Sequence, residues 1–143
     1  MAVITAEQLA DADAALRTGQ RDLIARHFAG DMRGLVPGHD QLSGQKNNLD
    51  EFIGSLARVG EGSKHSFHMR RVATMAAEDY SADVTHNTGH RAGEPDRVLD
   101  IDVTHWMRWR DGTVIHARGA IFGNGTAHHD TFGAEAALKP QRR

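Results

Sequence analysis

Apolar and polar residues alternate through two runs in the second half of the chain, residues 97–110 and 113–122. The runs flank Asp111-Gly112, and Asp-Gly is among the strongest short signals for a β-hairpin. A two-residue turn then places His105 opposite Arg118, with both side chains on one face of the sheet. The pattern therefore predicts two antiparallel strands in this register.

One face of the predicted hairpin is apolar except at its middle, where two histidines and an arginine interrupt it. This face contains Ile101, Val103, His105, Met107 and Trp109 from the first strand, and Val114, His116, Arg118, Ala120 and Phe122 from the second. The other face of the first strand carries Asp100, Asp102, Thr104, Trp106 and Arg108, which suits solvent or a partner subunit. An apolar wall with a few central polar groups is typical of a ligand cavity.

The first half of the chain has helical periodicity. Apolar residues recur at helical spacing in three segments, and each is bounded by capping residues. Thr5 is the predicted N-cap of the first helix, Asn47 or Asn48 that of the third, and Gly30 ends the second. The predicted helices are 5–18, 20–29 and 49–59, with a short extended piece at 32–36 and a loop at 39–47.

Two further strands are expected between the helices and the hairpin, at residues 64–78 and 80–91. The alternation slips in the first of them, which predicts a β-bulge near Arg70-Arg71. In the second, Val84 and His86 alternate with polar residues. Pairing His90 with Leu99 would put His86 near Val103 on the pocket face.

Helices followed by consecutive antiparallel strands are the α+β pattern. We expect a curved antiparallel sheet packed on three N-terminal helices, with a conical pocket between the layers. Residues 1–132 form one domain in this interpretation, and 133–143 form a tail that is partly helical at 134–138 and otherwise disordered.

Composition narrows the function classes. A net charge of −2 gives no electrostatic reason to expect nucleic acid or an anionic membrane as a partner. The chain has no cysteine, which excludes disulfides and thiolate chemistry, and no apolar run approaches the ~20 residues that span a bilayer. Its first residues lack the features of a secretory signal, so a cytoplasmic location is expected.

The order of these elements resembles the SnoaL-like polyketide cyclases of the nuclear-transport-factor-2-like superfamily. The likeness rests on the glycine-terminated second helix, on Val36-Pro37-Gly38 followed by Leu42-Ser43-Gly44 and a helix with Phe52, on the hairpin from Val103 to Val114, and on Asp130-Thr131-Phe132. It spans nearly the whole chain. The resemblance implies the conical α+β fold and a range of activities that includes cyclases, ketosteroid isomerases, epoxide hydrolases, dehydratases and non-catalytic binding modules.

The acidic residues that such enzymes use are missing at the matching positions. Cyclases and epoxide hydrolases of this kind place a carboxylate at the end of the last strand, where this chain has residues 120–124 without one. Ketosteroid isomerases have a base aspartate where Val36 stands, and their oxyanion-hole aspartate falls near His105. Any chemistry must therefore depend on other groups.

His105 is the first catalytic candidate, because an imidazole in an apolar pocket can exchange a proton near pH 7. Arg118 on the same face could hold a carboxylate or an enolate oxygen, and His86 is the third candidate. Each has a structural alternative: a hydrogen-bonded core histidine, a salt bridge to Asp50 or Glu51, and a histidine at the rim. The predicted substrate-binding residues are Tyr80, Val84, Val103, Met107, Trp109, His116, Ala120, Phe122, Phe28, Phe52 and His39.

The leading hypothesis is a small cofactor-free cyclase or isomerase that acts on an apolar substrate by an aldol-like closure or a cycloaddition. The alternative is a non-catalytic binding or scaffold module, and a ketosteroid-isomerase-like or epoxide-hydrolase-like enzyme is less favoured. The histidine spacings show no persuasive set of metal ligands, so neither a metal nor a cofactor is predicted. A large aromatic among polar residues suggests that Trp106 lies in a homodimer interface.

Overall fold

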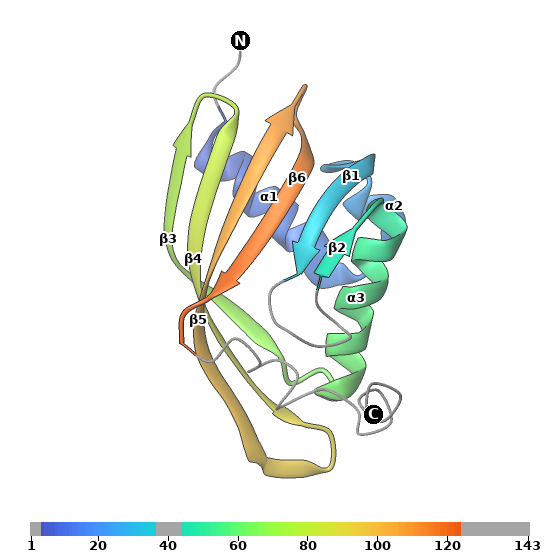
Figure 1. The fold of residues 1–143 in the computed structure, drawn as a ribbon, viewed down its shortest axis with the longest axis vertical. Coiled ribbons are helices and arrows are strands. Elements are labelled where there is room, and N and C mark those ends of the chain that lie inside the picture. The colour runs from blue at the N-terminus through green and yellow to red at the C-terminus, as the bar shows by residue number, and fades with distance from the viewer. Residues whose placement is uncertain (1–3, 37–43, 124–143) are drawn as a thin grey trace, which may run out of the picture.

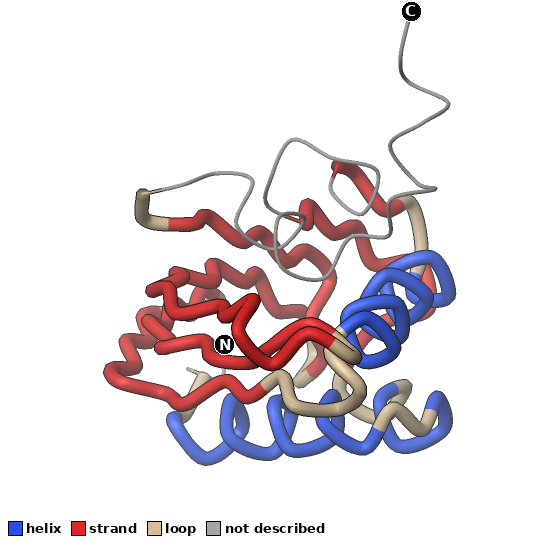
Figure 2. The backbone as a smooth tube through the Cα atoms, turned by 90° about the horizontal axis from the view of Figure 1, so that it is seen from below, coloured by secondary structure: helices blue, strands red, loops and turns tan. Residues whose placement is uncertain are grey.

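The described helices of this protein lie on one of the two faces of its sheet. The computed structural model describes residues 4–36 and 44–123. Within these residues six strands lie in the order β2-β1-β6-β5-β4-β3, and Figures 1 and 2 show the helices on one side of the curved sheet. The elements are α1 (Ala6–Thr18), α2 (Arg21–Ile24), β1 (Phe28–Val36), β2 (Gly44–Lys46), α3 (Leu49–Gly62), β3 (His68–Ala77), β4 (Tyr80–Arg91), β5 (Glu94–Arg110) and β6 (Thr113–Ile121). We call the face toward the helices the inner face and the opposite one the outer face.

The α+β class and the curved sheet over three helices are confirmed, but the sheet is mixed rather than antiparallel. β1 runs parallel to β6, while the other neighbouring strands pair antiparallel. The hairpin signals along the chain describe only strands that follow one another. The pairing of β1 with β6 joins segments far apart in sequence, so no local pattern predicts its direction.

The helix caps form as their residues predict. Thr5 accepts a hydrogen bond from the backbone N–H of Gln8, whose side chain accepts one from the backbone of Thr5 in return. This reciprocal pair satisfies two N–H groups that the first turn leaves without helical partners. Asn48 caps α3 by accepting from the N–H of Glu51 at 2.9 Å.

The second helix is much shorter than predicted, because the chain enters the sheet early. α2 ends at Ile24, and Phe28 already begins β1. The backbone N–H of Val114 in β6 donates to the carbonyl of His27 at 2.8 Å, which joins this segment to β6. The predicted loop at 39–47 also contains the short strand β2, whereas His39 and the C-terminal tail lie outside the described residues.

The Asp-Gly turn is confirmed, but the predicted register fails beyond it. Asp111 and Gly112 both have positive φ, 52° and 80°, as a tight hairpin turn requires. Trp109 still faces Val114, after which one extra residue in β6, Ile115, forms a β-bulge. The predicted partners therefore shift by one position, and a shift of one sends every later side chain of β6 to the opposite face.

The pairing of β4 with β5 differs from the prediction by one residue as well. His90 pairs with Val98 and not with Leu99, so His86 faces Asp102 on the outer face. The bulge predicted in β3 is confirmed between Arg71 and Ala73. Because of the register between β4 and β5, the polar side chains of β4 point inward and are buried: Ser81, Asp83, Thr85 and Asn87.

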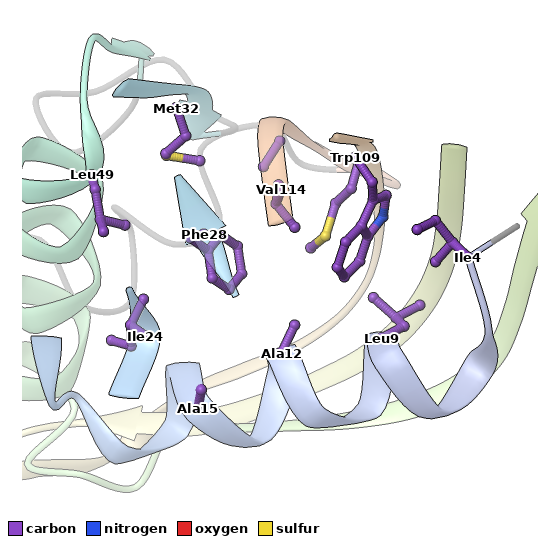
Figure 3. Close-up of a cluster of buried hydrophobic side chains, with 12 residues drawn as sticks. Ile4, Leu9, Ala12, Ala15, Ile24, Phe28, Met32, Leu49, Trp109 and Val114 are labelled. Atoms are coloured by element: carbon purple, nitrogen blue, oxygen red, sulfur yellow. The ribbon is translucent and has the colours of Figure 1, made fainter. Parts of the chain in front are cut away.

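The apolar core lies between α1 and the sheet (Figure 3). Phe28 is fully buried at its centre, and Trp109 beside it is 2% exposed. The indole N–H of Trp109 donates to the hydroxyl of Ser81 at 2.9 Å, so the ring is packed and also hydrogen-bonded. None of the described helices is both long and apolar enough to cross a membrane.

Replacing Phe28 with alanine should lower the free energy of unfolding by about 3–5 kcal/mol, because it leaves a cavity in this core. Denaturant unfolding followed by circular dichroism measures the change. Val72→Ala is the control, since Val72 is exposed at the β3 bulge and should change stability by less than about 0.5 kcal/mol. Equal losses in the two variants would contradict this placement of the core.

Candidate functional site

A group of charged and polar side chains interrupts the inner face where β3, β4 and β5 pass beneath α1. Strand alternation directs Asp83 of β4 and His105 of β5 to this face, and the two residues are direct cross-strand partners. Arg71 reaches the same region from β3, and Asp13 from α1. Buried charges are rare unless they are paired, so this group is the strongest candidate for a functional site.

His105 and Asp83 form a hydrogen-bonded pair in which only the imidazole is accessible. The Nδ1 of His105 lies 2.9 Å from Oδ1 of Asp83. The side chain of Asp83 is 2% exposed, whereas that of His105 is 23% exposed. A carboxylate at Nδ1 favours the tautomer that carries its proton there, which leaves the Nε2 lone pair available as a proton acceptor.

Arg71 and Asp13 form a second ion pair beside the first, through the Nη2 of Arg71 and Oδ2 of Asp13. Burial raises the pKa of the Asp13 carboxyl, and the negative charge of Asp83 raises it further. The hydrogen bond and charge of Arg71 oppose this rise, as does His105. The four side chains therefore interact electrostatically as one cluster, which we call the inner charge cluster: Asp13, Arg71, Asp83 and His105.

Apolar side chains that are only partly buried extend the helix-covered side of the sheet beyond this cluster. They come from α3, β3, β5 and the segment before β3: Phe52, Leu56, Val59, Phe67, Met69 and Ile101. Gly34 of β1 lets α3 approach, because a Cβ there would lie 2.9 Å from the Phe52 ring. On the other side of His105 its partner in β6 is Gly119, which has no side chain. An accessible base among apolar groups suits proton transfer on an apolar molecule.

The structure places some predicted site residues on the inner face. His105 lies there as predicted, and so do Val103, Met107 and Trp109, but these three are buried. The core against α1 includes Met107, Trp109 and Phe28, so these residues pack within the protein and do not line a pocket wall. Phe52 is partly buried and packs against the same core, where its ring stacks on Phe28.

The other predicted site residues of β4 and β6 lie on the outer face, which corrects their assignment to the pocket wall. Arg118 pairs with Trp106 and not with His105, and its guanidinium lies 5.5 Å from the centre of the Trp106 ring. The bulge at Ile115 turns the side chains of β6 to the outer face, and the one-residue difference in register does the same for those of β4. The residues concerned are Arg118, His116, Ala120, Tyr80, Val84 and His86. Phe122, which directly follows β6, is 55% exposed.

Charge is unevenly distributed over the outer face. His86 bridges two aspartates, with Nε2 2.8 Å from Asp100 and Nδ1 2.8 Å from Asp102. At the other end Trp106 packs against Tyr80, His116 and Arg118. Burial lowers the pKa of His116, and the nearby positive charges of Arg118, Arg33 and Arg108 lower it further.

The sequence did not predict three members of the inner charge cluster as site residues: Asp83, Arg71 and Asp13. Asp83 alternates with apolar residues, a pattern that assigns the polar positions of a strand to solvent. Asp13 did carry a signal, because it follows Leu9 at helical spacing and so interrupts the buried stripe of α1. A carboxylate within such a stripe needs a buried partner.

Comparison with known proteins places the chain by fold alone. No family model matches the sequence, and no curated protein matches it. A Xanthomonas campestris protein of unknown function with a cystatin-like fold has a TM-score of 0.76 and 21% identity, with 90% of this chain and 97% of that one covered. An NTF2-like protein of Burkholderia xenovorans has a TM-score of 0.72 and 18% identity, covering 88% and 93% of the two chains. A Jannaschia protein named as a SnoaL-like polyketide cyclase has a TM-score of 0.69 and 16% identity, covering 90% of both chains. The chain thus has the NTF2-like fold that its sequence resembles.

The raised pKa of Asp13 predicts a pH-dependent difference in stability between the wild type and Asp13→Asn. Below the ordinary value of 3.8 the carboxyl is protonated in both the folded and the unfolded chain. As the pH rises through the raised pKa, the folded protein must ionise a buried group, so the wild type should lose stability relative to Asp13→Asn. Urea unfolding between about pH 2 and 8 measures this difference.

Asp50→Asn provides a control of opposite sign. The hydrogen bond from Arg21 lowers the pKa of Asp50, so its contribution is present above 3.8 and is lost as the pH falls through the lowered pKa. The same trend in both variants would contradict the burial of Asp13.

Proposed function

We propose that this chain is a cofactor-free cyclase or isomerase that transfers protons within an apolar, polyketide-like carbonyl substrate. The observation that supports the proposal best is the His105–Asp83 pair, a partly exposed imidazole whose Nδ1 is held by a buried carboxylate. General acid–base catalysis needs such a group, with a free ring nitrogen and a partner that stabilises the imidazolium. Structures of similar fold include a protein named as a SnoaL-like polyketide cyclase and a hypothetical protein with a ketosteroid isomerase-like fold, which supports the proposal at the level of the fold.

The reaction begins with removal of a proton from the carbon next to a carbonyl. The Nε2 of His105 accepts this proton, and the electron pair of the broken C–H bond moves into an enolate. The enolate carbon then attacks a second carbonyl of the same molecule, forming the new C–C bond of a ring. The resulting alkoxide takes the proton back from the imidazolium, so that the product is an isomer of the substrate.

Asp83 and Arg71 stabilise the two charges that this reaction creates. The carboxylate of Asp83 stabilises the imidazolium, because opposite charges in a poorly solvated site attract strongly. Arg71, whose side chain is 23% exposed, stabilises the enolate oxygen through its positive charge. The partly buried apolar side chains of α3 and the inner face would favour a folded substrate conformation and exclude water.

Hydrogen exchange tests the base without knowledge of the natural substrate. Two carbonyl probes, α-tetralone and 1-(2-naphthyl)butane-1,3-dione, are incubated with the protein in D2O, and deuterium at the α-carbon is followed by NMR. His105→Ala should lower the protein-catalysed exchange rate by about 10²–10⁴-fold, and Asp83→Asn should also lower it.

Arg118→Ala and His116→Ala are the matched controls, because both residues lie on the outer face. They should exchange at the wild-type rate, with all four variants keeping the wild-type circular dichroism spectrum. Exchange that survives in His105→Ala, or that depends equally on Arg118, would refute this role of His105.

A non-catalytic binding module on the same fold is the second candidate. The burial of Phe28 and Trp109 in the core favours it, since these rings fill space that a larger cavity would occupy. In that case neither probe exchanges above the rate in buffer.

We further propose that a second copy of the chain covers the outer face. No described helix covers this face (Figure 1), yet it presents Met75 at 62% exposure and Trp106 at 37%, next to Ala82 and Val84 of β4. Large exposed apolar groups beside one another are typical of interfaces. A two-fold axis through this face would bring the acidic end with Asp102 against the basic end with Arg108.

Trp106→Glu should convert the dimer to a monomer, since it places a charge within the apolar part of the interface. Light scattering at micromolar concentration measures the mass. Arg58→Glu on the exposed side of α3 adds a carboxylate elsewhere and should remain dimeric. A monomeric wild type, or a Trp106→Glu variant that is still dimeric, would place no interface here.

A further inference from the structure

The charges of the inner charge cluster do not balance when His105 is neutral. Arg71 and Asp13 are paired with each other and cancel. Asp83 is paired with His105, which carries no charge in its base form. The described part of the site therefore has one uncompensated negative charge, and it lies directly behind the nitrogen that would accept a proton.

This excess charge has opposite effects on two kinds of ligand. A neutral carbonyl compound brings no charge, and the imidazolium formed by proton transfer is attracted by Asp83. A carboxylate of the same shape brings a second negative charge into a region where Asp83 is 2% and Asp13 10% exposed. Repulsion between like charges is poorly screened where water is excluded.

Arg71 would attract a carboxylate if it were unpaired, and Asp13 prevents this. The Asp13 carboxylate comes from α1 and binds the guanidinium through Nη2. The Nε of Arg71 is buried without a hydrogen-bond partner, so the guanidinium keeps one donor that Asp13 does not satisfy. Because that donor is buried, a ligand meets Arg71 only through the exposed part of its guanidinium, 23% of the side chain, and Asp13 reduces the net charge offered there.

We propose that Asp13 is a specificity-determining residue that makes this site select neutral, enolisable carbonyl compounds and reject their carboxylate analogues. This inference rests on the proposed function, because it concerns the same site. Asp13 acts through Arg71 and touches no reacting atom, so it is a positioning residue.

A pair of probes with one ring system separates charge from shape. 2-Acetylnaphthalene is neutral and 2-naphthoate is its carboxylate counterpart, and calorimetry at pH 8 gives the dissociation constant of each. The wild type should bind the ketone at least about tenfold more tightly, since a like charge within several Å costs on the order of a tenfold change in affinity or more.

Variants of the ion pair then change the charge in steps. Asp13→Asn removes one negative charge and should tighten naphthoate binding by about tenfold, with little effect on the ketone. Arg71→Gln should weaken naphthoate binding. The double variant Asp13→Asn/Arg71→Gln restores the wild-type net charge and should restore the wild-type ratio of the two dissociation constants. Asp100→Asn on the outer face removes an equal charge away from the site and should change neither constant.

Three results would overturn the proposal. They are equal binding of both probes by the wild type, binding of neither probe, and the same naphthoate affinity in Asp13→Asn and in the double variant. The binding readout is independent of turnover. If deuterium exchange is absent while the selectivity follows the charges, the proposed function fails and this inference stands. If exchange occurs without selectivity, the reverse holds.

Discussion

The single extra residue in β6 determines which chemistry this sheet presents on each face. Ile115 lies between Val114, which pairs with Trp109, and His116, which pairs with Arg108. Because side chains alternate along a strand, that insertion sends every later residue of β6 to the other face. Without it, Arg118 would lie beside His105 and a guanidinium would neutralise Asp83. With it, the neighbour of His105 is Gly119.

The polar side chains of β4 on the inner face can be buried because they are hydrogen-bonded. Each buried polar side chain of β4 has a partner within the fold: Ser81 binds Trp109, Asp83 binds His105, and Thr85 donates to Asn87 at 2.7 Å. A buried polar group without a partner costs about 1–3 kcal/mol, so these pairs maintain the stability of a strand whose polar side faces inward. His105 is the member with accessible surface, which makes it the point where this network meets a ligand.

The direction in which β4 turns its side chains links the site to the dimer that we propose. If β4 turns its polar residues inward, its apolar residues Ala82 and Val84 must face outward. The inner face then acquires groups for proton transfer, and the outer face acquires apolar surface that water solvates poorly. One constraint, the register of β4 against β5, therefore produces both features.

The sequence by itself determined the elements whose signals are local. The Thr5 and Asn48 caps, the Asp111-Gly112 turn and the bulge in β3 each follow from the conformational preferences of a few adjacent residues, and the structure has all of them. The sequence also predicted that His105 faces inward, because the alternation of side chains within β5 does not depend on other strands. The order of helices and strands along the chain was sufficient to predict the fold class.

Only the tertiary structure decided how strands align with one another. The energy of one register over the next depends on packing against α1 and on the hydrogen bonds of buried groups, and neither is visible in the alternation of one strand. For the same reason the sequence could not pair Asp13 with Arg71, which are 58 residues apart. It could not show that Asp83, polar in a strand with apolar neighbours, faces inward. The site of this protein is made of contacts between distant segments, so its chemistry appears only once the sheet and α1 have packed together.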